Sequence, residues 1–191
     1  ADDSGRFVIT WQDTRNQRYE IYAQRFSSQG LALGENFRVS GKYAILDKPI
    51  PAIASDRMGN FAIVYEDKYN GPEFHEIFGQ KFKFNGEKDG GFQANRDPGG
   101  VHELPDIAFD RTDQFVVTWV HVIDGQKSVH AKRYGGLGDW WFRVNTTYDN
   151  AKYAAVTCIG NEKFVLAWQN LSDGERNIIA QPYFMNGNYG G

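Results

Sequence analysis

The chain has 191 residues, of which 41% are hydrophobic and 15% aromatic, and it carries 21 glycines against 6 prolines. Its 24 acidic and 21 basic residues give a formal net charge of −3, without a long run of either sign. This distribution argues against nucleic acid or an anionic membrane as partner, because both need a concentrated basic surface. No apolar run approaches the roughly eighteen residues of a membrane-spanning helix, so membrane insertion is not expected.

One phrase returns four times along the chain, at intervals of about fifty residues. It reads GRFVITWQD, GNFAIVYED, DQFVVTWVH and EKFVLAWQN, at residues 5–13, 59–67, 113–121 and 162–170. Apolar residues fill alternate as well as intervening positions, and glycine or polar residues flank each copy. This pattern predicts β-strands that are covered on both faces.

Three further phrases keep the same order around each copy of the first. One precedes it (PAIASD, PDIAFD, AAVTCI, at 51–56, 105–110 and 154–159), and two follow it (IYAQRF, IFGQKF, VHAKRY, IIAQPY, at 21–26, 77–82, 129–134 and 178–183; then FRVS, FQAN, FRVN, at 37–40, 92–95 and 142–145). Four strands in about fifty residues are typical of a propeller blade, in which each sheet buries an aromatic face against its neighbour's aliphatic face. We therefore predict an all-β fold, a four-bladed β-propeller of four imperfect repeats with incomplete first and last blades. The predicted single domain spans 1–191, with repeats near 1–47, 48–101, 102–150 and 151–191; a β-sandwich of duplicated hairpins is the alternative.

The two ends of the repeat pattern predict open sheet edges. Aligning the copies leaves the first without its innermost strand and the last without its outermost strand. Exposed strand edges recruit partners. We expect the edge at Ile178, Ala180 and Tyr183 to pair with another chain, as a homo-oligomer, or with a further segment of a longer parent protein.

The composite pattern D-x-x-G-x-F-V-V-x-W-x-D, followed by I-Y-A-Q-R-F and G-x-x-F-x-V-N, resembles repeats of bacterial and archaeal extracellular β-propeller proteins. The turn ASDRMGNF, at residues 54–61, is loosely similar to the Asp-box hairpin of sialidases and related propellers. This resemblance implies an extracellular or cell-surface location and implies no functional residue.

Polar and aromatic residues follow the copies of the main phrase. The candidates for a ligand or contact surface are Asp13, Arg15, Asp67, Tyr69, Asp124 and Asp173, together with Trp140 and Trp141. Aromatic rings cover apolar sugar surfaces and carboxylates accept hydroxyl protons, so such a rim suits a glycan; an ordinary solvated rim is the alternative. One indole of the tryptophan pair is expected to pack between repeats and the other to lie at a contact surface.

Other residues favour structural roles. Asp2, Asp56 and Asp110 recur at one offset and predict Asx-turns that close hairpins, with calcium binding as the alternative. Cys158 lies in an apolar run and is expected to be a buried, unreactive thiol. The four histidines lack the spacing of a metal site, so no cofactor is predicted beyond the possible calcium.

The leading functional hypothesis is an extracellular, non-enzymatic propeller module for assembly or adhesion, in which intermolecular strand pairing produces a filament or surface structure. The alternatives are a carbohydrate-binding propeller and a sialidase-like glycosidase fragment. No catalytic residue is predicted, since no carboxylate pair is singled out at the separation that glycoside hydrolysis requires.

Overall fold

The computed structural model describes residues 1–41, 49–68, 75–96, 99–135, 138–145, 150–172 and 174–185. These residues form fourteen strands in four antiparallel sheets, which confirms the prediction of an all-β chain. Across these ranges no helix is long and apolar enough to cross a membrane.

Each sheet consists of strands that follow one another along the chain, and we number the sheets in chain order. Sheet 1 contains β1 (Phe7–Asp13), β2 (Glu20–Phe26) and β3 (Phe37–Arg38). Sheet 2 contains β4 (Ala52–Ser55), β5 (Phe61–Asp67), β6 (Glu76–Phe82) and β7 (Lys88–Gln93). Sheet 3 contains β8 (Val101–Phe109), β9 (Phe115–Ile123), β10 (Gln126–Tyr134) and β11 (Trp140–Arg143). Sheet 4 contains β12 (Lys152–Ile159), β13 (Lys163–Ser172) and β14 (Glu175–Phe184).

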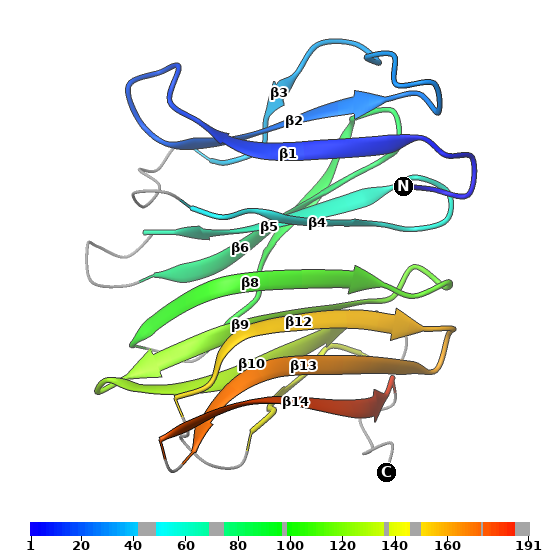
Figure 1. Ribbon diagram of the computed structural model, residues 1–191. Helices are drawn as coiled ribbons and strands as arrows, with labels where there is room; N and C mark the ends of the chain where they lie inside the picture. The colour runs from blue at the N-terminus through cyan, green and yellow to red at the C-terminus, as the bar shows by residue number, and fades with distance from the viewer. Residues whose placement is uncertain are drawn as a thin grey trace.

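The four sheets lie side by side in chain order. Figure 1 shows sheet 1 at one end, sheet 4 at the other, and sheets 2 and 3 between them. Strand β4 contacts β1 on one side and β8 on the other, and β12 contacts β8 and β9. The described residues therefore form an open stack. This arrangement is propeller-like, and the described sheets do not close into a ring, because sheets 2 and 3 separate the outer face of sheet 1 from that of sheet 4.

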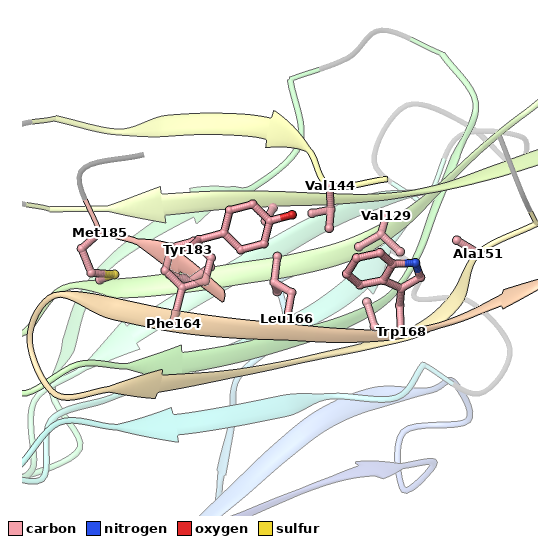
Figure 2. Close-up of a cluster of buried hydrophobic side chains, with 11 residues drawn as sticks. Val129, Val144, Ala151, Phe164, Leu166, Trp168, Tyr183 and Met185 are labelled. Carbon is pink, nitrogen blue, oxygen red and sulfur yellow. The ribbon is translucent and has the colours of Figure 1, made fainter. Parts of the chain in front are cut away.

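Neighbouring sheets pack an aromatic face against a face of small and aliphatic side chains, as predicted. Between sheets 1 and 2, the residues Ile21, Ala23 and Val39 meet Phe61, Ile63, Tyr65 and Phe82. Between sheets 2 and 3, Ala62, Val64 and Ile77 meet Phe115, Val117, Trp119 and Tyr134. Between sheets 3 and 4, Val116, Val129 and Ala131 meet Phe164, Leu166, Trp168 and Tyr183 (Figure 2). Each fully buried large side chain contributes about 1.5–3 kcal/mol to folding, so these three layers hold the stack together.

Three aspartates hold the tight turns that precede β1, β5 and β9. Asp2 Oδ1 accepts the N–H groups of Ser4 and Arg6, each at 2.9 Å. Asp56 Oδ1 accepts the N–H of Asn60 at 2.9 Å, and Asp110 Oδ1 accepts that of Gln114 at 3.0 Å. The predicted Asx-turn role is confirmed, because each carboxylate satisfies backbone donors that the tight turn would leave without partners.

Candidate functional site

A stacked pair of aromatic rings recurs at the same place in all four sheets. The ring centroids are 5.0 Å apart in Phe7–Phe26, 4.9 Å in Phe61–Phe82, 4.5 Å in Phe115–Tyr134 and 5.3 Å in Phe164–Tyr183, with interplanar angles of 12° to 14°. In sheets 2, 3 and 4 both rings of the pair are buried against the preceding sheet. In sheet 1 both rings are only partly buried. The pair therefore has one geometry in four places, and within the described ranges no sheet covers it in sheet 1.

The uncovered side of sheet 1 is an aromatic surface that we call the aromatic end face, made of Phe7, Ile9, Trp11, Tyr22 and Phe26. Strand alternation and the pairing of β1 with β2 place these residues on the face opposite Ile21 and Ala23. Ile9 is 48% exposed, whereas its equivalents Ile63 and Leu166 are fully buried. Phe7, Trp11 and Phe26 are partly buried, and Tyr22 is 8% exposed beneath Arg15. This face thus has the composition of a buried layer, and Ile9 is its exposed residue.

Asp13 and Arg15, two predicted surface residues, hold the aromatic end face in shape. Asp13 Oδ2 accepts the Trp11 indole N–H at 3.1 Å, and the Arg15 guanidinium bonds Asp13 at 2.5 Å while lying 4.1 Å from the centre of the Tyr22 ring. The hydrogen bonds from Arg15 lower the pKa of Asp13 well below its usual range. The two residues therefore form a fixed, mutually neutralising pair beside the aromatic rings.

The opposite end of the stack presents the aliphatic end face, made of Val165, Ala167, Ile178 and Ala180. Ala167 pairs with Ala180, and both point away from the Phe164 and Trp168 side that packs on sheet 3. Ile178 is 76% exposed, whereas its equivalents Ile21, Ile77 and Val129 are fully buried. Of the three predicted edge residues, Ile178 and Ala180 lie on this surface, and Tyr183 points into the core with 1% exposure.

The remaining acidic candidates do not form a cluster. Asp67 ends β5 with 4% exposure, and burial raises its pKa to about 6. Asp124 lies exposed in the tight turn between β9 and β10, with φ of 50°. No hydrogen bond or ion pair joins Asp13, Asp67 and Asp124 to one another within the described ranges. Tyr69 and Asp173 lie outside the described residues.

Trp140 and Trp141 occupy the outer strand β11. Their exposed fractions are 38% and 41%, so the expectation that one indole packs in the interior is wrong. Trp140 stacks on Phe142 with centroids 4.4 Å apart, and Trp141 stacks on His130 at 5.8 Å. As consecutive residues of a strand they point to opposite faces of sheet 3, so they do not form one platform.

A pair of glutamates that the sequence interpretation did not single out lies between sheets 2 and 3. Glu66 Oε1 accepts the N–H of Leu104 at 2.7 Å, and Glu103 pairs with Lys127. Burial raises the pKa of Glu66, and the charge of Glu103 raises it further. Leu104 has φ of 56°, a left-handed conformation that is strained for a branched residue, where the pairing of β8 with β9 shifts register. The sequence gives no signal of this conformation, because Pro105 favours an extended backbone for the residue before it.

Three histidines are buried on the sheet 2 side of sheet 3. The rings of His102 and His121 stack with centroids 4.5 Å apart, and His121 meets His130 edge-on at 5.1 Å. Burial, with a contribution from the two neighbouring imidazoles and Arg143, lowers the pKa of His130 to about 3. No group of three or more His, Cys, Asp or Glu residues in the described ranges is arranged to hold a metal ion. These histidines therefore act as core residues.

Cys158 lies half-buried in β12, and its thiol approaches the carbonyl oxygen of Ala108 at 3.5 Å. Burial raises its pKa to about 12, so the thiol stays protonated at neutral pH and is a poor nucleophile.

No protein-family model matches the chain, and no curated protein sequence matches it. Several solved structures resemble it in fold, and two of them illustrate the likeness. One is an endo-arabinase from Bacteroides thetaiotaomicron VPI-5482, with a TM-score of 0.55 and 14% identity over 99% of this chain and 75% of that one. The other is a protein of unknown function from Dyadobacter fermentans DSM 18053, with a TM-score of 0.57 and 10% identity over 92% of this chain and 48% of that one. At these identities the likeness concerns the fold alone.

Proposed function

We propose that this protein is a propeller-like assembly module whose copies associate end to end. The aromatic end face of one copy packs on the aliphatic end face of the next, so the association repeats the layer found three times inside the molecule. The open stack of sheets and its likeness to the two solved structures support a propeller-like unit. An extracellular or cell-surface setting, an expectation from the sequence resemblance, belongs to the same proposal.

The observation that carries the proposal is the exposure of Ile178. Its three equivalents are fully buried under the aromatic face of the following sheet, and Ile178 is 76% exposed. The aromatic end face is the surface that the repeat places against such a position, because Phe7 and Phe26 stack as the three buried pairs do. A contact between two different faces of identical chains is heterologous, so it extends into a filament unless the rotation between copies closes it.

The test uses one charged substitution on each end face, with sedimentation equilibrium as the measurement. We expect the wild-type chain to form oligomers as its concentration rises, because each copy keeps both faces. Ile9→Glu and Ile178→Glu should each weaken self-association at least about a hundredfold, since each places a charge in an apolar contact. A wild-type chain that stays monomeric at the highest soluble concentration refutes the proposal.

Mixing the two variants gives the sharper result. The Ile9→Glu copy keeps its aliphatic end face and the Ile178→Glu copy keeps its aromatic one, so a one-to-one mixture should form a capped dimer. Met58→Glu is the control, because Met58 is 68% exposed in the turn between β4 and β5 and lies on neither end face. Its association should match that of the wild type. Dimers of either end-face variant alone would show a like-with-like contact and contradict the head-to-tail arrangement.

A second candidate function is binding or hydrolysis of a glycan between Glu66 and Glu103. Glycoside hydrolysis needs one protonated and one ionised carboxyl group. Burial favours the protonated form of Glu66, and Glu103 forms an ion pair with Lys127. The similarity in fold to an endo-arabinase makes an aryl arabinoside the first substrate to try. Release of the aryl group that Glu66→Gln and Glu103→Gln abolish and Asp124→Asn preserves would support this function, and no release by the wild type would remove it.

A further inference from the structure

The outer edge of β14 corresponds to an edge that is occupied in the other three sheets. In sheets 1, 2 and 3 the strand next to the outer segment is β2, β6 or β10. One residue of that strand (Ile21, Ile77 or Val129) makes two hydrogen bonds to the outer segment through its own backbone C=O and N–H. Its C=O accepts an N–H at 2.8 Å (Val39 to Ile21, Ala94 to Ile77, Val144 to Val129). Its N–H donates to a side-chain oxygen of the next residue (Ser40 at 3.1 Å, Asn95 at 2.9 Å, Asn145 at 2.8 Å). The outer segment is thus held by the same pair of bonds each time.

Two residues further along, a small side chain makes room for a phenylalanine ring. Ala23 lies opposite Phe37, Gly79 opposite Phe92 and Ala131 opposite Phe142. The fit is tightest at Gly79, where an added Cβ would lie only 2.1 Å from the Phe92 ring. The ring therefore sits directly over the small residue, and a larger side chain at this position would displace it.

Sheet 4 repeats both features on a strand that has no outer neighbour in the described residues. Ile178 stands at the position of the two bonds and Ala180 at the position of the small residue, and both are exposed. Strand β14 pairs with β13 alone within those ranges. Figure 1 shows β14 at the lower boundary of the stack. The backbone N–H and C=O of Ile178 are therefore exposed together with Ala180, the small residue that corresponds to the one under the phenylalanine ring in the other sheets. We call this position the ring seat.

We infer that the β14 edge is a docking site for an extended segment of another polypeptide with the pattern Phe-x-(Val or Ala)-(Ser or Asn). The phenylalanine ring covers Ala180, the N–H of the Val or Ala binds the C=O of Ile178, and the Ser or Asn oxygen accepts the N–H of Ile178. Strand addition of this kind takes affinity from main-chain bonds and specificity from the side-chain seat. The inference rests on the proposed assembly function, because it names the strand that a partner adds at the aliphatic end.

The test measures binding of a fluorescein-labelled peptide, GDWWFRVN, which copies residues 138–145 of this chain. The protein is the Ile9→Glu variant, which keeps β14 and does not self-associate through the aromatic end face. We expect a saturable rise in fluorescence anisotropy. A peptide carrying Phe142→Ala should bind at least about tenfold more weakly, since it leaves the ring seat empty.

Substitutions in the protein test the two halves of the site. Ala180→Leu fills the seat and should weaken binding at least about tenfold, as an overpacked position does. Thr157→Leu is the matched control, because it adds the same side chain to the same face of sheet 4 on β12, away from the edge, and should leave binding unchanged. Ile178→Pro removes the outward N–H, which an edge strand tolerates, and should also weaken binding. Circular dichroism melting curves establish that each variant is folded.

The two proposals fail in different ways. If the wild-type chain does not associate but the peptide binds with the expected dependence on Phe142 and Ala180, the stacking proposal fails and the docking site stands. If association follows the end-face variants but no peptide binds up to its solubility limit, the docking site is refuted. Equal binding of the GDWWFRVN and Phe142→Ala peptides, or equal effects of Ala180→Leu and Thr157→Leu, also refutes it.

Discussion

Sheet 1 and sheet 3 carry nearly the same strand, FVITWQD in β1 and FVVTWVH at the start of β9, in different surroundings. In β9 the residues Phe115, Val117 and Trp119 are buried beneath sheet 2. In β1 the corresponding residues keep the same alternation, but Phe7 and Trp11 are only partly buried and Ile9 is exposed. The strand and its stacked ring pair therefore form from local sequence and from pairing within the sheet. Burial requires a neighbouring sheet. A face that no sheet covers does not contribute the free energy of burying its apolar side chains.

The comparison extends to the charged residue that ends the strand in sheets 1 and 2. Asp13 is bonded to Arg15 and Trp11, and its pKa is lowered. Asp67 holds the same repeat position, its Oδ1 has no hydrogen-bond partner among the described residues, and burial raises its pKa to about 6. The same repeat position thus stabilises the ionised carboxylate of Asp13 in sheet 1 and destabilises that of Asp67 in sheet 2.

The largest expected effect is the difference in stability loss between alanine substitutions at Ile63 and at Ile9. Ile63→Ala should lower the free energy of unfolding by about 2–5 kcal/mol, because it leaves a cavity between sheets 1 and 2. Ile9→Ala should cost less than about 1 kcal/mol, because half of that side chain already contacts water. Urea denaturation at low protein concentration, where copies do not associate, measures both. Equal costs would show that the aromatic end face is packed in the isolated chain.

The second effect concerns charge and has opposite signs in the two sheets. Because the folded-state pKa of Asp67 is raised from 3.8 to about 6, its ionisation opposes folding, and its unfavourable contribution grows as pH rises through that window. Asp67→Asn should therefore increase the free energy of unfolding by roughly 1–3 kcal/mol at pH 7, with the gain vanishing below about pH 4. Asp13→Asn should destabilise the chain above about pH 4 and lose its effect as pH falls further. Urea denaturation across this pH range measures both, and a variant of Asp67 that is less stable at pH 7 would contradict the assignment.

The repeats explain why so much of the fold was predictable. The copies of the phrase around Tyr65, Trp119 and Trp168 form the second strand of sheets 2, 3 and 4, and the copy around Trp11 forms the first described strand of sheet 1. Alternation within the phrase also predicted which faces meet, since it places the ring pairs on one face of each sheet. Ile21, Ile77 and Val129 lie with small neighbours on the other face, against which the next ring pair packs. Patterns of this kind are local, and local patterns are what a single sequence records.

Closure of the ring and the glutamate pair were not predictable, because both depend on relations between sheets. A closed ring depends on the rotation from one sheet to the next, which accumulates across the stack and is set by side-chain packing. Glu66 and Glu103 come from different sheets, and the strained backbone at Leu104 brings the N–H of Leu104, the residue after Glu103, to the Glu66 carboxylate. The prediction that one ring of the Trp140–Trp141 pair is buried was wrong for a related reason. The size and apolar character of the indoles favoured burial, but their place on the outer strand β11 leaves both rings partly exposed.

The smallest expected effect concerns a hydrogen bond that a threonine makes in both sheet 1 and sheet 3, rather than the burial of an apolar side chain. Thr118 Oγ1 donates to the carbonyl oxygen of His130 at 2.8 Å in the buried sheet 3, and Thr10 Oγ1 donates to that of Tyr22 at 2.9 Å in sheet 1. Thr118→Val should cost about 1 kcal/mol, because a buried carbonyl loses a donor that water cannot replace. Thr10→Val should cost less than about 0.5 kcal/mol, since water reaches the partly buried site. Both values follow from thermal unfolding monitored by circular dichroism. Equal losses would mean that the hydrogen bond itself, rather than the covering sheet, decides the cost, and the difference between end and middle sheets would then be confined to their apolar faces.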